Sequence, residues 1–110
     1  MLRFFLVALL FSTAAMAQAP DRPVTILAGY PAGGLVDIVT RLVAEGMKPK
    51  LPNGVVVVNR PGAAGAVAVA EMARSKPDGL TIVMTPASAL VIAPQMQSLA
   101  YRTPDDYDPF

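Results

Sequence analysis

Two glycine-rich segments contain the residues whose types and spacing suit the binding of an anion. Residues 30–34 read Tyr-Pro-Ala-Gly-Gly and are followed by Asp37, and residues 59–65 read Asn-Arg-Pro-Gly-Ala-Ala-Gly. Glycine lets a ligand approach the backbone closely. A helix that starts after such a loop presents unpaired N–H groups with partial positive charge. Two such loops closing on a carboxylate would bind it without any lysine or arginine contact.

Each of these residues also has a structural alternative. The glycines could serve only tight turns or helix–sheet packing. Asp37 falls in the first turn of a predicted helix, where an acid is stabilising whether it caps the helix or contacts a ligand. Asp37 and Arg41 are spaced i,i+4 with the acid first, which is the favourable order for an ion pair along a helix. Arg60 could clamp a carboxylate or pair with a surface acid. Ser88, after a predicted strand, could donate to a ligand or cap the next helix.

The residue types that the chain lacks argue against an enzyme. It has no histidine and no cysteine, which removes the commonest general base, the Ser-His and Cys-His nucleophile pairs and the usual zinc ligands. Neither G-x-G-x-x-G nor G-x-x-x-x-G-K-[ST] occurs, and a net charge of +1 predicts no nucleic-acid partner. Asp105, Asp106 and Asp108 lack the glycine and closing glutamate of an EF-hand loop. We expect no catalytic residue, no metal and no cofactor.

The elements that must position the two loops alternate between strand and helix. Apolar runs bounded by proline and glycine predict buried strands at 24–29, 55–58 and 80–85. Helices are predicted from residue 35 to the prolines at 49 and 52, and over 64–75. Uniformly apolar strands separated by helices are typical of a parallel sheet covered on its faces. We therefore predict an α/β fold with a partial doubly wound parallel sheet. On the first helix, one apolar stripe is expected to face the core, formed by Leu35, Ile38, Val39, Leu42, Val43 and Met47.

Residues 1–17 have the three parts of a secretory signal peptide. Arg3 gives a positive start, residues 4–11 are an unbroken apolar run, and Ala15-Met16-Ala17 is the small-x-small pattern of a cleavage site. The alternative, a membrane-spanning helix, needs about 20 apolar residues, and this run ends at Gln18. The sequence therefore predicts export, with the mature chain over 18–110.

Four segments in the mature chain resemble a known family. They are YPAGGLVDIVTRL at 30–42, VVVNRPGAAG at 56–65, KPDGLTIV at 76–83 and YRTPDDYDPF at 101–110. In this order they resemble the periplasmic solute-binding receptors of tripartite tricarboxylate transporters, the Bug-type binding proteins. The resemblance implies that residues 18–110 are an incomplete N-terminal lobe, the first lobe of a periplasmic binding protein type II fold.

The resemblance also implies which residues hold the ligand. In such receptors a small organic carboxylate lies between two lobes, held largely by backbone groups of the first two loops. Carried over by position, the ligand-binding candidates are Tyr30, Pro31, Ala32, Gly33, Gly34, Asp37, Asn59, Arg60, Gly62, Ala63, Thr85 and Ser88.

Three functions stay open at this point. The first is a periplasmic receptor, or a fragment of one, that presents a carboxylate to membrane transporter subunits. The second is a non-functional truncated remnant of such a receptor. The third is a small exported α/β enzyme or nucleotide-binding module, against which the missing motifs argue. The sequence does not identify the ligand.

Overall fold

The computed structural model describes residues 20–102. The predicted signal peptide and the acidic residues Asp105, Asp106 and Asp108 lie outside this range. The strands and helices are β1 (Val24–Ala28), α1 (Leu35–Met47), β2 (Val55–Asn59), α2 (Ala66–Ala73), β3 (Thr81–Met84), α3 (Ala87–Val91) and α4 (Ala93–Met96), with short 3-10 turns η1 (Lys48–Lys50) and η2 (Ala63–Gly65).

The three strands form one parallel sheet in the order β2-β1-β3. β1 is central, with Thr25 paired to Val56 on one side and to Thr81 on the other. Its side chains are almost all buried. A largely apolar run such as VTILA favours a central strand that has a neighbouring strand on each side and a helix on each face. The parallel α/β sheet predicted from the sequence is confirmed.

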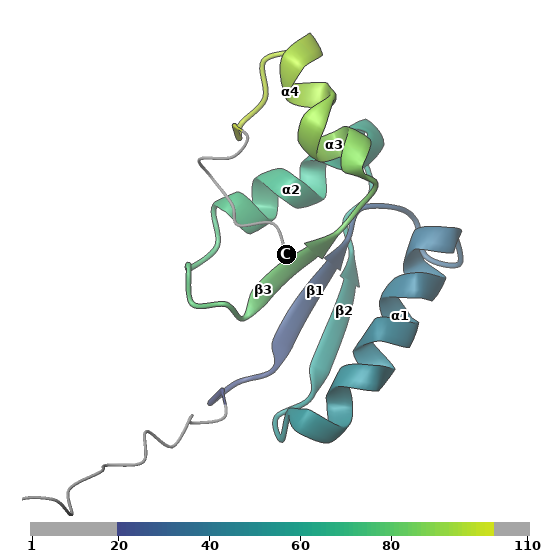
Figure 1. The fold of residues 1–110 in the computed structure, drawn as a ribbon, viewed down its shortest axis with the longest axis vertical. Helices are drawn as coiled ribbons and strands as arrows, with labels where there is room; N and C mark the ends of the chain where they lie inside the picture. The colour runs from purple at the N-terminus through teal and green to yellow at the C-terminus, as the bar shows by residue number, and fades with distance from the viewer. Residues whose placement is uncertain (1–19, 103–110) are drawn as a thin grey trace, which may run out of the picture.

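The two longer helices cover opposite faces of this sheet. α1 packs on β1 and β2, and α2 packs on β1 and β3 (Figure 1). The first crossover runs from β1 to β2, and the second passes back across β1 to reach β3. Because crossovers between parallel strands are right-handed, a reversal of direction places the second helix on the other face. The doubly wound arrangement follows from this reversal.

The hydrophobic core on the α2 side is closed by a residue from the end of the described chain. Val69 of α2 and Ala89 of α3 are buried together with Tyr101, which is 2 % exposed and donates a hydrogen bond from its hydroxyl to the Ala89 carbonyl. The sequence assigns Tyr101 to a polar stretch without periodicity. The structure shows instead that its ring fills the space beside α2.

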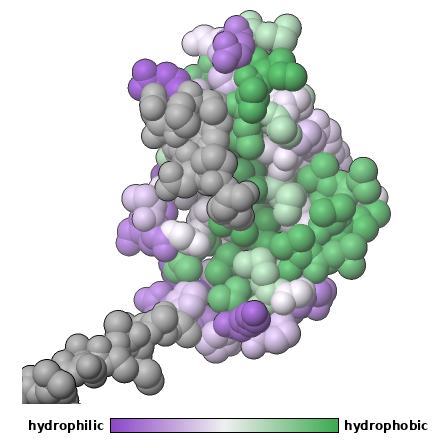
Figure 2. Space-filling view, in the orientation of Figure 1, coloured by the Kyte–Doolittle hydropathy of each residue, from purple (hydrophilic) through white to green (hydrophobic). Residues whose placement is uncertain are grey.

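The predicted core face of α1 is wrong. Its apolar stripe is largely exposed, with Leu35 at 77 % and Leu42 at 68 %. The residues that α1 buries are Asp37, Thr40 and Ala44. Thr40 is accommodated because its hydroxyl donates to the Val36 carbonyl at 2.6 Å. In Figure 2 the stripe forms a hydrophobic surface over α1.

The boundaries of the other elements differ modestly from prediction. The helix predicted over 64–75 begins at Ala66 and ends at Ala73, because the residues before it adopt left-handed backbone angles. The three strands are found within one residue of their predicted ends. α3 and α4 were not predicted, since the apolar stretch after Pro86 has no clear period.

Candidate functional site

The loops that follow β1 and β2 lie at the same edge of the sheet, because parallel strands carry their carboxyl ends together. Residues 31–34 of the first loop and 60–64 of the second are exposed. In open α/β sheets, ligands bind outside this edge. The structure therefore brings both glycine-rich segments to the side where a ligand is expected.

The first loop leads directly into α1 without a side-chain cap. Gly34 is the N-cap residue, and it can offer no side-chain acceptor to the first turn. The backbone N–H groups of Leu35 and Val36 then have no acceptor within the helix. Since the helix dipole adds partial positive charge at this end, the turn suits an anionic guest.

Asp37 lies buried beneath this loop, with 4 % of its surface exposed. Its carboxylate accepts hydrogen bonds from Arg41 Nε at 3.1 Å, from the Gly33 N–H at 2.9 Å and from Asn59 Nδ2 at 2.9 Å. These donors, Arg41 first, lower the pKa of Asp37 from 3.8 to about 2. The carboxyl group is therefore ionised at any neutral or mildly acidic pH.

The second loop has an unusual backbone. Four consecutive residues have positive φ angles, and two of them are not glycine: Ala63 at 47° and Ala64 at 53°. A non-glycine residue in the left-handed region costs about 1–2 kcal/mol. Such strain gathers at functional sites, where the surrounding structure holds it in place. The sequence gives no signal for it, because alanine has no preference for this region.

Arg60, in the second loop, pairs with an acid of α2. Its Nε donates to Glu71 Oε2 at 2.7 Å, and both side chains are partly exposed, at 44 % and 38 %. Of the two roles open for Arg60, pairing with a surface acid is the one seen here. An exposed pair of this kind contributes little to stability.

The third loop differs from the first two. The Thr85 hydroxyl is buried with no hydrogen-bond partner among the described residues, and it lies against Gly65 and Gly29. A Cβ at Gly65 would come within 2.1 Å of that hydroxyl, so this glycine is required for packing. Ser88 is exposed at the rim of a hollow of about 350 Å³ between Ala64 and α4. Among the described residues, Asp37 and its hydrogen-bond partners Gly33, Arg41 and Asn59 form a group, here called the Asp37 cluster, that includes neither Thr85 nor Ser88.

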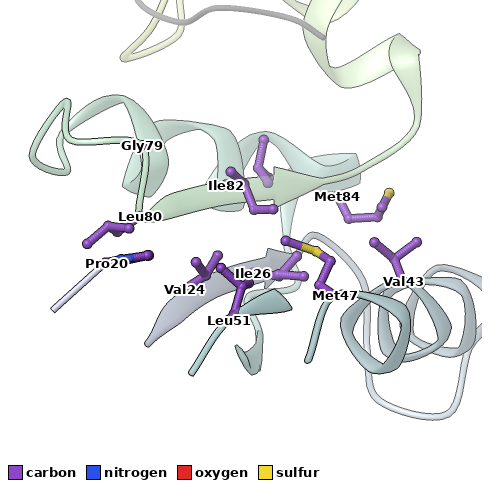
Figure 3. A pocket seen from close by; sticks show the side chains of 11 residues that line it. Pro20, Val24, Ile26, Val43, Met47, Leu51, Gly79, Leu80, Ile82 and Met84 are labelled. Carbon is purple, nitrogen blue, oxygen red and sulfur yellow. The ribbon is translucent and has the colours of Figure 1, made fainter. Parts of the chain in front are cut away.

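A larger, apolar hollow of about 410 Å³ lies elsewhere, on the α1 side of β1 and β3 (Figure 3). Its walls are Val43 and Met47 of α1, Val24 and Ile26 of β1, Ile82, Val83 and Met84 of β3, with Pro20, Leu51, Gly79 and Leu80 closing the far end. A carboxylate needs donors, and these walls offer almost none. We therefore place the candidate anion site at the loops and not in this larger hollow.

At the two glycine loops, the structure adds Arg41 and Gly65, which were not among the predicted site residues. Arg41 was recognised only as the i,i+4 partner of Asp37, and Gly65 only as the end of the second glycine motif.

Among residues 20–102, no cluster of three or more acidic side chains is placed to hold a metal ion. Over the same range, no helix has the length and apolar character needed to cross a bilayer.

Comparison with known proteins gives consistent matches. A family described as the tripartite tricarboxylate transporter family receptor matches residues 39–110. A UPF0065 protein of Bordetella bronchiseptica is 42 % identical over 98 residues, covering 87 % of this chain and 29 % of its own. The solved periplasmic binding protein BugD is 44 % identical with a TM-score of 0.56, covering 58 % of this chain and 21 % of its own.

A second solved structure is MatC from Rhodopseudomonas palustris with bound malate. It is 32 % identical with a TM-score of 0.68, and the match covers 82 % of this chain and 31 % of MatC. The chain spans less than a third of the length of the curated relatives it matches. The fold described above is thus similar to one portion of these periplasmic binding proteins.

Proposed function

This chain belongs to the tripartite tricarboxylate transporter receptor family, and we propose that it captures a small organic carboxylate for a membrane transporter. We assign it to the periplasm, with residues 1–17 as the signal peptide and 18–110 as part of an N-terminal lobe. It acts as a binding receptor and not as an enzyme. MatC, a related structure, holds malate, which supports a carboxylate of this size as the ligand class.

The observation that carries the proposal is the convergence of two uncapped glycine loops at one sheet edge. Their neighbouring cations are already paired, Arg41 with Asp37 and Arg60 with Glu71. The donors left for an anion are the backbone N–H groups at the starts of α1 and α2, where charge-assisted hydrogen bonds contribute about 1.5–3 kcal/mol each. The carboxylate is therefore held by backbone groups, with side chains from elsewhere setting its identity.

The test is a calorimetric titration of the chain with L-malate, and with malate dimethyl ester as the uncharged control. We expect heat from the acid and none from the ester. Gly33→Val should weaken binding at least tenfold, about 1.4 kcal/mol. Gly33 has a φ of 85° and open space beside it, so a β-branched side chain there strains the loop and occupies the anion's approach.

Arg60→Ala is the comparison variant. It should change affinity less than Gly33→Val, because Arg60 is engaged with Glu71. If Arg60→Ala abolishes binding while Gly33→Val is tolerated, a side-chain clamp holds the carboxylate and the backbone account is wrong. No binding of malate or of other small di- and tricarboxylates would contradict the receptor proposal itself.

A further inference from the structure

Both carboxylate oxygens of Asp37 already accept hydrogen bonds from within the protein. Both oxygens accept from Arg41 Nε at 3.1 Å; one also accepts from the Gly33 N–H and the other from Asn59 Nδ2. The residue is buried below exposed loop residues. With its acceptors occupied and its charge opposed by Arg41, Asp37 is poorly suited to contact an anionic guest.

Asn59 connects the two loops through its side chain. Its Nδ2 donates both to Asp37 Oδ1 and to the Tyr30 carbonyl at 3.1 Å. Its Oδ1 accepts from the Arg41 guanidinium at 3.3 Å. Asn59 is the last residue of β2, whereas Tyr30 and Asp37 belong to the loop and helix after β1. The strand ends themselves are paired through the backbone, and this one side-chain amide adds a tie between the end of β2 and the loop and helix that follow β1.

The spacing of Gly33, Asp37 and Arg41 explains why the unit forms. Helical side chains point back toward the N-terminus, so Asp37, in the first turn, reaches the N–H of the residue four positions earlier. Arg41 lies one turn further along the same face of α1 and reaches Asp37 from below. The positive φ of Gly33 belongs to the loop conformation in which its N–H meets this carboxylate.

From these contacts we propose that Asp37, Arg41 and Asn59 are positioning residues that lock the first glycine loop to the second, and that they do not touch the ligand. The consequence of this lock is that the two helix starts keep a fixed separation, which pre-organises the anion site. This consequence rests on the proposed function. Ordering exposed loops before binding removes an entropic cost that binding would otherwise bear. The lowered pKa of Asp37 is consistent with this role, because the carboxylate stays ionised and accepting.

The first measurement needs no ligand. In the isotope-labelled chain, we expect the Gly33 amide proton shift to depend only weakly on temperature, as for a hydrogen-bonded amide. Asp37→Asn leaves one acceptor oxygen for the three donors Gly33, Arg41 and Asn59, so it should steepen this dependence. Asn59→Ala, a change in the other loop, should steepen it too. Glu45→Gln is the matched control, since it makes the same carboxylate-to-amide change at an exposed position of α1; it should leave Gly33 unchanged.

The second measurement separates positioning from direct contact. Asp37→Asn removes a negative charge, so a residue that merely faced the anion would give tighter L-malate binding when changed. A positioning residue gives the opposite, and we expect at least tenfold weaker binding, with Glu45→Gln within twofold of the unaltered chain. Where Asp37→Asn does not fold, Arg41→Lys replaces it, because it keeps the charge but lacks the second N–H that reaches Asn59; it should shift the Asn59 side-chain amide signals and weaken malate binding.

Two results would overturn the inference. One is an Asn59→Ala chain whose Gly33 amide is unchanged, which would mean that the loops are not coupled. The other is tighter malate binding by Asp37→Asn. A chain that binds no malate counts against the proposed function alone, because the Gly33 measurement still decides whether the loops are locked together.

Discussion

The two faces of the sheet are closed to different extents, although each carries one long helix. On the α2 face, Val69, Ala89 and Tyr101 are buried together in one packed cluster. On the α1 face, the helix covers β1 and β2, while the surface over β1 and β3 remains an apolar hollow. The α2 face has α3 and the 101 region to complete it, and the α1 face has no such element among residues 20–102.

This difference shows that an amphipathic pattern predicts a buried face only where another element covers it. The α1 stripe has the period of a core helix, yet Leu35 and Leu42 are mostly exposed. Contiguous apolar surface of this kind marks a place where proteins associate. The polar side of α1, by contrast, is joined through Asp37 to Gly33 of the first loop and to Asn59 at the end of β2. If stability resides in the closed face and in the Asp37 cluster, changes there should cost more free energy of unfolding than changes in the open stripe.

The largest effect is expected from Tyr101→Ala on the closed face. Removing a buried aromatic ring leaves a cavity, and the loss should be about 3–5 kcal/mol in the free energy of unfolding. Urea unfolding followed by circular dichroism measures it. Tyr101→Phe keeps the ring and loses the hydrogen bond to Ala89, so it should cost about 1 kcal/mol. Equal effects from the two variants would show that the ring is not what closes this face.

A smaller effect is expected from acid at the Asp37 cluster. The pKa of Asp37 is about 2 in the folded chain and near 3.8 in the unfolded chain. The unfolded state therefore binds a proton first, and the stabilisation is fully present above pH 4 and is lost as the pH falls toward 2. Asp78 acts in the same direction, since the Leu80 N–H and Arg22 lower its pKa. Asp37→Asn should flatten the fall in stability between pH 4 and 2.

The comparison for this acid experiment is Asp78→Asn. It should leave the Asp37 contribution in place, so the fall between pH 4 and 2 should persist. If Asp37→Asn and the unaltered chain lose stability in parallel over this range, the Asp37 cluster does not contribute to folding as its contacts indicate.

The smallest effect on stability is expected on the open face. Leu42→Lys changes a residue that is 68 % exposed, and the free energy of unfolding should move by no more than about 0.5 kcal/mol. The same change should reduce binding of a hydrophobic dye and self-association in sedimentation experiments. A loss of several kcal/mol would show that the stripe is covered in solution.

Much of the fold could be predicted from local pattern, and most of the site could not. β1 and the length of α1 follow from an apolar run, a change of period and the prolines at 49 and 52. Tyr101 was missed because the residues that follow it are mostly polar and its partner, Ala89, lies in a stretch without a period. Burial of this kind is decided by tertiary packing and leaves no mark on adjacent residues.

The candidate site shows the same limit. The two glycine motifs were recognised, and the i,i+4 pairing of Asp37 with Arg41 was predicted and is confirmed. The contact of Asp37 with Asn59, 22 residues away in sequence, depends on the strand order and could not be read from spacing. The left-handed backbone angles of Ala63 and Ala64 could not be predicted from the sequence either, since only the surrounding loop imposes them.

The central position of β1 has a consequence for how the chain opens. Its backbone groups pair with β2 on one side and with β3 on the other. If either neighbouring strand detaches, β1 therefore stays paired to the remaining one. Amide protons of β1 should therefore be the slowest to exchange with solvent, and those at the outer edges of β2 and β3 faster. The first glycine loop is attached directly to this most protected strand. Local opening at either edge of the sheet would thus leave the base of that loop in place.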